Sequence, residues 1–64
     1  MKRKQFLAYL NQNGCQLVRE GSRHSLFRNE QNGFISAVPR HPELNDITCA
    51  KICKELGILY PGKN

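Results

Sequence analysis

The chain contains two histidines, and each lies in a short motif whose residue types can do chemistry together. His24 ends a Gly-Ser-Arg-His motif, and His41 is the third residue of a Pro-Arg-His-Pro motif. Histidine exchanges a proton near neutral pH, so it suits general acid–base catalysis. The neighbouring Arg23 and Arg40 can bind phosphate through their paired N–H donors. The motifs therefore favour proton transfer at a phosphate ester. A purely structural interpretation places His24 at a strand end and His41 in a loop.

Length and charge limit the class of protein. The chain has 64 residues, with ten Lys and Arg against five Asp and Glu, a net charge of +5. A chain of this size forms one domain and buries only about 60% of its unfolded surface. The basic excess favours an anionic partner such as nucleic acid, although a solvated basic surface is the ordinary alternative. No apolar run approaches the roughly 20 residues of a membrane span or forms a signal peptide, so we expect no membrane association and a cytoplasmic location.

Three cysteines, an odd number, do not make a disulfide framework, and this agrees with a reducing compartment. Cys49 and Cys53 are four residues apart and share one face of any helix that contains them. A zinc site would need further ligands, such as Cys15 and His41, and the chain has no C-x-x-C pair. We therefore expect the cysteines to pack in the core, with no metal and no other cofactor.

Hydrophobic spacing predicts five elements. A helix ends before Gly14, three strands follow, and a last helix begins after a cap at Asn45 or Asp46 and ends at Gly57. The third strand is apolar on both faces, so we expect it to be the best covered. Short connections make the sheet an antiparallel meander, and two amphipathic helices cover one face. The prediction is an α+β fold, an α-β-β-β-α two-layer sandwich in residues 1–59 with a loose tail at 60–64. The first helix is expected at residues 2–13, and the three strands at residues 15–20, 25–28 and 34–38.

The second strand is expected at residues 25–28, directly after His24, and an alternative start at Arg23 would include His24 in it. Alternation places His24, Leu26 and Arg28 on one face and Ser25 and Phe27 on the other. Each face holds one large apolar residue, so alternation does not decide which face is buried. The helices leave one face of the sheet uncovered, and a nucleic acid or protein partner would lie there. His24 is expected to face that side or to lie at its edge.

With these motifs in order, the chain resembles the HicA family, the small mRNA interferase toxins of HicA–HicB toxin–antitoxin pairs. The resemblance runs from Lys2 to Ile58. Gly-Ser-x-His followed after a hairpin by Pro-Arg-His-Pro is its most specific part. Further matching segments are Lys2-Arg3-Lys4, Leu17-Val18-Arg19, Asn32-Gly33, Glu43-Leu44 and residues 52–58.

The resemblance implies a fold like the double-stranded-RNA-binding domain and cleavage of mRNA without a metal, by one histidine. By position that histidine is His24. The third place of the motif, which is commonly a second histidine, is Arg23 here, so a paired histidine has no role. The resemblance also implies a HicB-family antitoxin that masks His24 and restores translation, in a hetero-oligomer with this chain.

The residues fit such chemistry. RNA carries its own nucleophile, the 2′-OH, and a histidine can take its proton. Arginine or hydroxyl donors can stabilise the developing charge on the phosphate without a metal. The sequence leaves open whether His41 or water supplies the second proton transfer. The predicted RNA-binding residues are Ser22, Arg23, Arg28, Arg40, His41, Lys2 and Lys4.

Two other classes of function are compatible with the composition. The first is a non-catalytic RNA-binding module, since a fold alone does not fix function. The second is a small protein-interaction or DNA-binding domain. A DNA reader would need a recognition helix, and the polar face of the last helix offers only Lys51 and Lys54 as cations.

Overall fold

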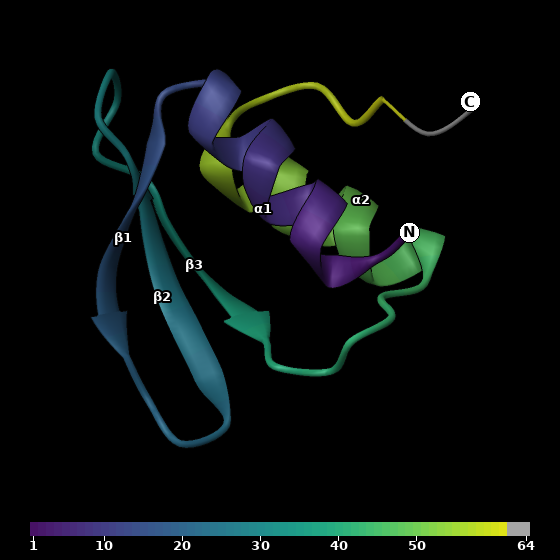
Figure 1. The fold of residues 1–64 in the computed structure, drawn as a ribbon. Coiled ribbons are helices and arrows are strands. Elements are labelled where there is room, and N and C mark those ends of the chain that lie inside the picture. The colour runs from purple at the N-terminus through teal and green to yellow at the C-terminus, as the bar shows by residue number, and fades with distance from the viewer. Residues whose placement is uncertain (62–64) are drawn as a thin grey trace.

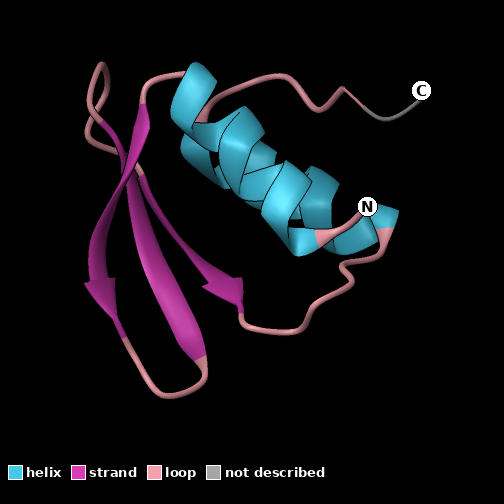
Figure 2. Ribbon diagram, in the orientation of Figure 1, coloured by secondary structure: helices cyan, strands magenta, loops and turns pink. Residues whose placement is uncertain are grey.

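The computed structural model describes residues 1–61 and contains the five expected elements. A three-stranded antiparallel sheet has the strand order β1-β2-β3. Both helices lie on the same side of this sheet, so the domain has two layers (Figure 1, Figure 2). The α-β-β-β-α prediction is confirmed. The elements are α1 (Arg3–Gln12), β1 (Cys15–Glu20), β2 (His24–Asn29), β3 (Ile35–Pro39) and α2 (Asp46–Leu56).

The two helices begin in different ways. At α2 the Asn45 side chain accepts a hydrogen bond from the Thr48 N–H at 2.8 Å, and Gly57 ends the helix with a left-handed φ of 75°. This is ordinary capping at both ends. At α1 no side chain caps the helix. Instead, the Arg3 N–H donates to the Pro42 carbonyl at 2.9 Å. The start of α1 is therefore held by the loop that follows β3.

The core lies between the sheet and the two helices. The apolar face of α2 is buried in it, and all three cysteines lie in this core, so the predicted core packing of the cysteines is confirmed. Burial, with smaller contributions from the nearby thiols of Cys49 and Cys15, raises the pKa of Cys53 to about 11. The core residues are Phe6, Leu10, Cys15, Phe27, Val38, Leu44, Cys49, Ile52, Cys53 and Leu56.

The third strand is not the best covered. β3 is an edge strand, and β2 is the central strand, paired on both sides. Phe34 and Ile35 are each 51% exposed, and Ala37 is exposed as well. Only Ser36 and Val38 of this stretch turn into the core. The expectation was wrong because an apolar composition on both faces does not reveal which strand ends the sheet.

The structure decides which face of β2 is buried. Ser25, Phe27 and Asn29 point toward the helices, whereas His24 is exposed on the uncovered side. Two polar residues are tolerated inside because both are hydrogen-bonded; the Asn29 Nδ2 donates to the Leu56 carbonyl at 2.8 Å. The inner face is therefore selected by Phe27 together with two satisfied polar groups.

A β-bulge changes the alternation along β1. The register shifts between Leu17 and Arg19, so Arg19 lies opposite Leu26 and Glu20 lies opposite Ser25. Without the bulge, Glu20 would share a face with Gln16 and point away from the helices. With it, Arg19 turns to the uncovered face and Glu20 turns toward Ser25.

The C-terminal segment is anchored further along the chain than expected. Ile58 and Tyr60 pack against the core, whereas the Leu59 side chain is 85% exposed. The Tyr60 hydroxyl donates to Asp46 Oδ1 at 2.6 Å, and this hydrogen bond raises the pKa of Tyr60. Tyr60 is therefore not part of a loose tail, and residues 62–64 of that expected tail lie outside the described residues. In residues 1–61, no helix has the length and apolar character needed to cross a bilayer.

Candidate functional site

His24 lies where three shallow hollows of the surface meet. One hollow runs over the uncovered sheet face past Arg19 and Leu26. A second runs toward the loop that holds Arg40 and His41. The third lies between β3 and α2. His24 lines all three, and its side chain is exposed. A ligand in any of these hollows would contact the imidazole.

Pairing of β2 with β3 brings the two sequence motifs together. His24 lies opposite Pro39, and the Arg40 N–H donates to the Arg23 carbonyl at 3.2 Å. One hollow is lined by both motifs, which are far apart in the sequence. Its lining residues are Ser22, Arg23, His24, Pro39, Arg40 and His41.

The turn before His24 depends on a glycine. The Gly21 N–H donates to the His24 carbonyl at 2.8 Å. A Cβ added at Gly21 would lie 2.9 Å from that same carbonyl oxygen. A side chain at this position would therefore push the turn away from the start of β2, and this explains the glycine of the first motif.

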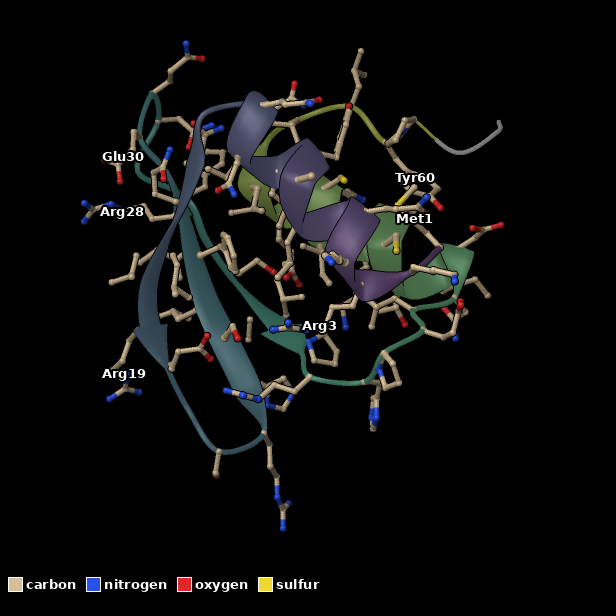
Figure 3. The ribbon with its side chains drawn as sticks, viewed as in Figure 1. Met1, Arg3, Arg19, Arg28, Glu30 and Tyr60 are labelled. Atoms are coloured by element: carbon tan, nitrogen blue, oxygen red, sulfur yellow. The ribbon has the colours of Figure 1, made fainter. Side chains whose placement is uncertain are left out.

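A chain of hydrogen bonds behind His24 starts from Arg3, which reaches from the start of α1 toward the sheet (Figure 3). The Arg3 Nη2 donates to Ser25 Oγ at 2.7 Å, and its Nε donates to the Pro39 carbonyl at 2.8 Å. The Ser25 hydroxyl donates to Glu20 Oε1, also at 2.7 Å. Glu20 in turn pairs with Arg40 Nη1. These contacts fix the end of β2 next to His24 and the loop that carries Arg40.

Neither Arg3 nor Glu20 was predicted from the sequence as a contributor to the site. Arg3 belongs to the basic segment Lys2-Arg3-Lys4 at the start of α1, where the helix dipole disfavours cations. For Arg3 the cost is offset by its two hydrogen bonds to the sheet. The residue type could have indicated this role for Arg3, because an arginine makes several directed hydrogen bonds, whereas Lys2 and Lys4 each present a single ammonium group.

Three predicted RNA-binding residues lie away from His24. Arg28 shares its sheet face but lies four residues along β2, about 13 Å away at roughly 3.3 Å per residue. It pairs with Glu30 at 3.4 Å. Lys2 and Lys4 are exposed at the start of α1 and line none of the three hollows around His24. The structure therefore gathers four of the predicted residues around His24 and leaves these three apart.

Arg19 joins the uncovered face instead. It lines the sheet hollow with His24, and Figure 3 shows Arg19 and Arg28 pointing away from the helices. Sequence analysis could not place it there, because the bulge in β1 has no clear signal in the sequence. The uncovered face therefore carries cations at both ends of β2.

The carboxylates of the chain are already engaged by its own groups. Glu20 binds Arg40 and Ser25, Glu30 binds Arg28, and Glu43 lies 3.9 Å from the N-terminal ammonium. Asp46 accepts from Tyr60, and Glu55 accepts from Ser36. In the part of the chain that the structure describes, no three His, Cys, Asp or Glu side chains gather as metal ligands. The surface around His24 is suited to an anionic group, with proton transfer by imidazole and charge stabilisation by arginine.

Comparison with known proteins bears on the family of the chain. Residues 3–58 match the model of the family described as HicA toxin of bacterial toxin-antitoxin. This span contains both motifs and all five elements, and it confirms the resemblance drawn from the sequence. No match was found among curated proteins or among solved structures.

Proposed function

The chain belongs to the HicA toxin family of bacterial toxin–antitoxin systems, and we propose that it is a metal-independent endoribonuclease that cleaves mRNA with His24 as its catalytic residue. Cleavage of mRNA would stop translation in the cytoplasm until the antitoxin binds. The observation that carries this proposal is the position of His24, exposed where three hollows meet and flanked by the two arginine-bearing motifs.

The reaction uses the nucleophile that RNA itself supplies. His24 accepts the proton of the 2′-OH, and the 2′-oxygen attacks the adjacent phosphorus. The bond from phosphorus to the 5′-oxygen of the next nucleotide breaks, and that oxygen takes up a proton. His41 lines the same hollow and is one candidate donor; a water molecule is the other.

Arginines next to His24 stabilise the charge that builds on the phosphate oxygens. The Arg23 side chain is exposed beside His24. Arg40 uses Nη1 for its contacts with Glu20 and with the Gly21 carbonyl. Its Nε and Nη2 therefore remain available to a phosphate. The Ser22 hydroxyl can donate a further hydrogen bond, so the site can act on a phosphate through N–H and O–H donors.

The remaining cations extend the RNA surface. Arg19 and Arg28 lie along the uncovered sheet face, and a single strand crossing that face would place successive phosphates near them. Lys2 and Lys4 would contact a longer RNA that continues past the start of α1. Binding should therefore weaken with salt, by a slope of about −0.7 per phosphate contact for a single strand.

The antitoxin partner of the family is proposed to cover His24. Because Arg19, Arg23 and Arg40 line the hollows that meet at His24, the surface there presents positive charge to a partner. An acidic antitoxin surface can replace RNA phosphate with carboxylate there. Inhibition then follows from competition for the same surface.

The test is cleavage of a defined single-stranded RNA in the presence of EDTA. We expect the parent to cut and His24→Ala to be slower by about 10² to 10⁴, the usual contribution of proton transfer by a side chain. His41→Ala, in the same hollow, is the matched variant and reports whether a second histidine takes part. A folded His24→Ala protein that cuts at the parental rate would contradict the assignment. A parent that binds RNA without cutting it would favour the non-catalytic RNA-binding alternative.

A further inference from the structure

β3 leaves part of its backbone unpaired at the outer edge of the sheet. The Asn29 N–H donates to the Phe34 carbonyl at 2.8 Å, so Phe34 turns its carbonyl toward β2. Along an antiparallel pair every second residue does so. Ile35 and Ala37 therefore turn their N–H and C=O groups away from β2. Within residues 1–61, no hydrogen bond from another segment reaches these groups.

The rest of this edge is closed. Pro39 has no N–H, and its carbonyl already accepts from Arg3 Nε at 2.8 Å. The chain then turns into the loop that binds the start of α1. The open stretch of the edge is therefore Ile35 to Ala37, which presents two donors and two acceptors in strand geometry.

The open edge lacks the features that usually prevent pairing with another chain. Natural edge strands carry charges, bulges or a covering segment. Here Phe34, Ile35 and Ala37 are exposed and uncharged. The facing wall is α2, where Ile47 is 82% exposed and Lys51 and Glu55 supply one charge of each sign. Between them lies a groove of about 470 Å³.

This groove ends at the proposed catalytic residue. Its lining includes Ala37 and Pro39 from β3, Ile47 and Lys51 from α2, and His24 from β2. A strand paired with Ile35 and Ala37 would run along the groove and reach the imidazole. One extended segment can therefore satisfy the free edge and cover His24 at the same time.

We propose that the edge of β3 is the docking site of an extended, acidic segment of a partner protein, which adds a fourth strand to the sheet and closes the groove over His24. Main-chain hydrogen bonds would give affinity, and pockets for alternate side chains would give specificity. The choice of an acidic segment follows from charge. Lys51 and Glu55 offset each other in the groove, whereas Arg19 and Arg23 lie beside His24 at its end, and the net charge is +5. A second copy of this chain would bring +5 against +5. The identification of the partner as the antitoxin rests on the proposed function.

The experiment is amide hydrogen exchange by NMR on the full-length labelled chain, free and in complex with the purified antitoxin of its own toxin–antitoxin pair. We expect the Ile35 and Ala37 amides to exchange at least about 100-fold more slowly in the complex. The matched control is Leu17 on β1, the other edge strand, whose amide should keep its rate. A complex in which Ile35 and Ala37 exchange as fast as in the free chain overturns the proposal, and so does the absence of any complex.

A pair of proline variants tests the same hydrogen bonds by affinity. Ala37→Pro removes an outward N–H and leaves the ladder to β2 intact, which an edge strand tolerates. We expect antitoxin affinity to fall at least about tenfold, and the corresponding Leu17→Pro change on β1 to leave it unaltered. Equal affinities of the folded parent and Ala37→Pro would count against strand addition. If Ala37→Pro does not fold, the exchange rates of the parent decide.

Further outcomes distinguish this proposal from self-association and from the catalytic proposal. A free chain that is dimeric by light scattering, with Ile35 and Ala37 already protected, would show that a second copy occupies the edge and would overturn the acidic-partner proposal. If β3 is protected in the complex but the parent does not cut RNA, the catalytic proposal is refuted and the docking site is supported. If the parent cleaves RNA and the β3 edge stays unprotected in the complex, the catalytic proposal is supported and the docking site is refuted.

Discussion

The two faces of β2 differ in what their side chains do. On the inner face, Ser25, Phe27 and Asn29 are buried, and both polar residues are hydrogen-bonded to other elements. On the outer face, His24 and Arg28 are exposed. Because neighbouring residues along a strand point to opposite faces, a catalytic group can sit directly beside a structural one. Changes on the outer face should therefore alter activity alone, and changes on the inner face should alter stability.

The largest expected effect is on the inner face. Phe27 is 3% exposed in the centre of the sheet, and Phe27→Ala should cost about 3–5 kcal/mol, through lost burial and a cavity. That cost is comparable to the whole stability of a domain of this size, so the variant should be largely unfolded at 25 °C. Leu26→Ala on the outer face is the matched control. Urea unfolding followed by circular dichroism measures the free energy of unfolding of both variants. Equal losses in Phe27→Ala and Leu26→Ala would contradict the difference between the two faces.

The next effect comes from Arg3, which binds Ser25 on the inner face of β2 and the Pro39 carbonyl at the end of β3. Hydrogen bonds to a charged group contribute about 1.5–3 kcal/mol, so Arg3→Ala should destabilise the domain by about 2 kcal/mol. It should also slow RNA cleavage, because the end of β2 and the Arg40 loop lose their support. Lys4→Ala, at an exposed position one residue along, should change neither by a measurable amount. Restoration of both properties by Arg3→Lys would show that charge alone is sufficient.

A smaller effect is the loss of stability at alkaline pH. Burial raises the pKa of Cys53 from 9.0 to about 11, so the folded state holds the thiol proton more tightly than the unfolded state. The stabilisation is complete below pH 9 and is lost as pH rises from about 9 to 11, by about 1 kcal/mol at pH 10. Unfolding in urea under reducing conditions at several pH values measures this slope. Cys53→Ala should flatten it, and Tyr60→Phe is needed beside it because the pKa of Tyr60 is raised as well. A slope that Cys53→Ala leaves unchanged would assign the effect to other groups.

The parts of the fold that sequence analysis found are those that local spacing determines. The buried face of α2 follows from apolar residues spaced three and four apart. The ends of this helix follow from Asn45 and Gly57. The order of elements follows from turn residues and short connections. The two motifs were also recognisable, because their residue types are distinctive.

The parts that it missed depend on contacts between distant segments. Whether β3 is central or at an edge is decided by how the hairpins associate, which composition does not show. The bulge that turns Arg19 outward and Glu20 inward is set by pairing with β2. The role of Arg3 depends on Ser25 and Pro39, more than twenty residues away. The roles assigned to His24 and to the RNA-binding residues stay predictions.

The most direct test of the account measures two properties on two adjacent variants, His24→Ala and Ser25→Ala. His24→Ala should lower RNA cleavage by at least about 100-fold and change the free energy of unfolding by less than about 0.5 kcal/mol. Ser25→Ala should cost about 1–3 kcal/mol, because Arg3 and Glu20 lose their shared partner. We therefore expect His24→Ala, and not Ser25→Ala, to lose activity while keeping the stability of the parent. A folded His24→Ala protein with parental cleavage, or one whose loss of activity follows only from unfolding, would contradict it.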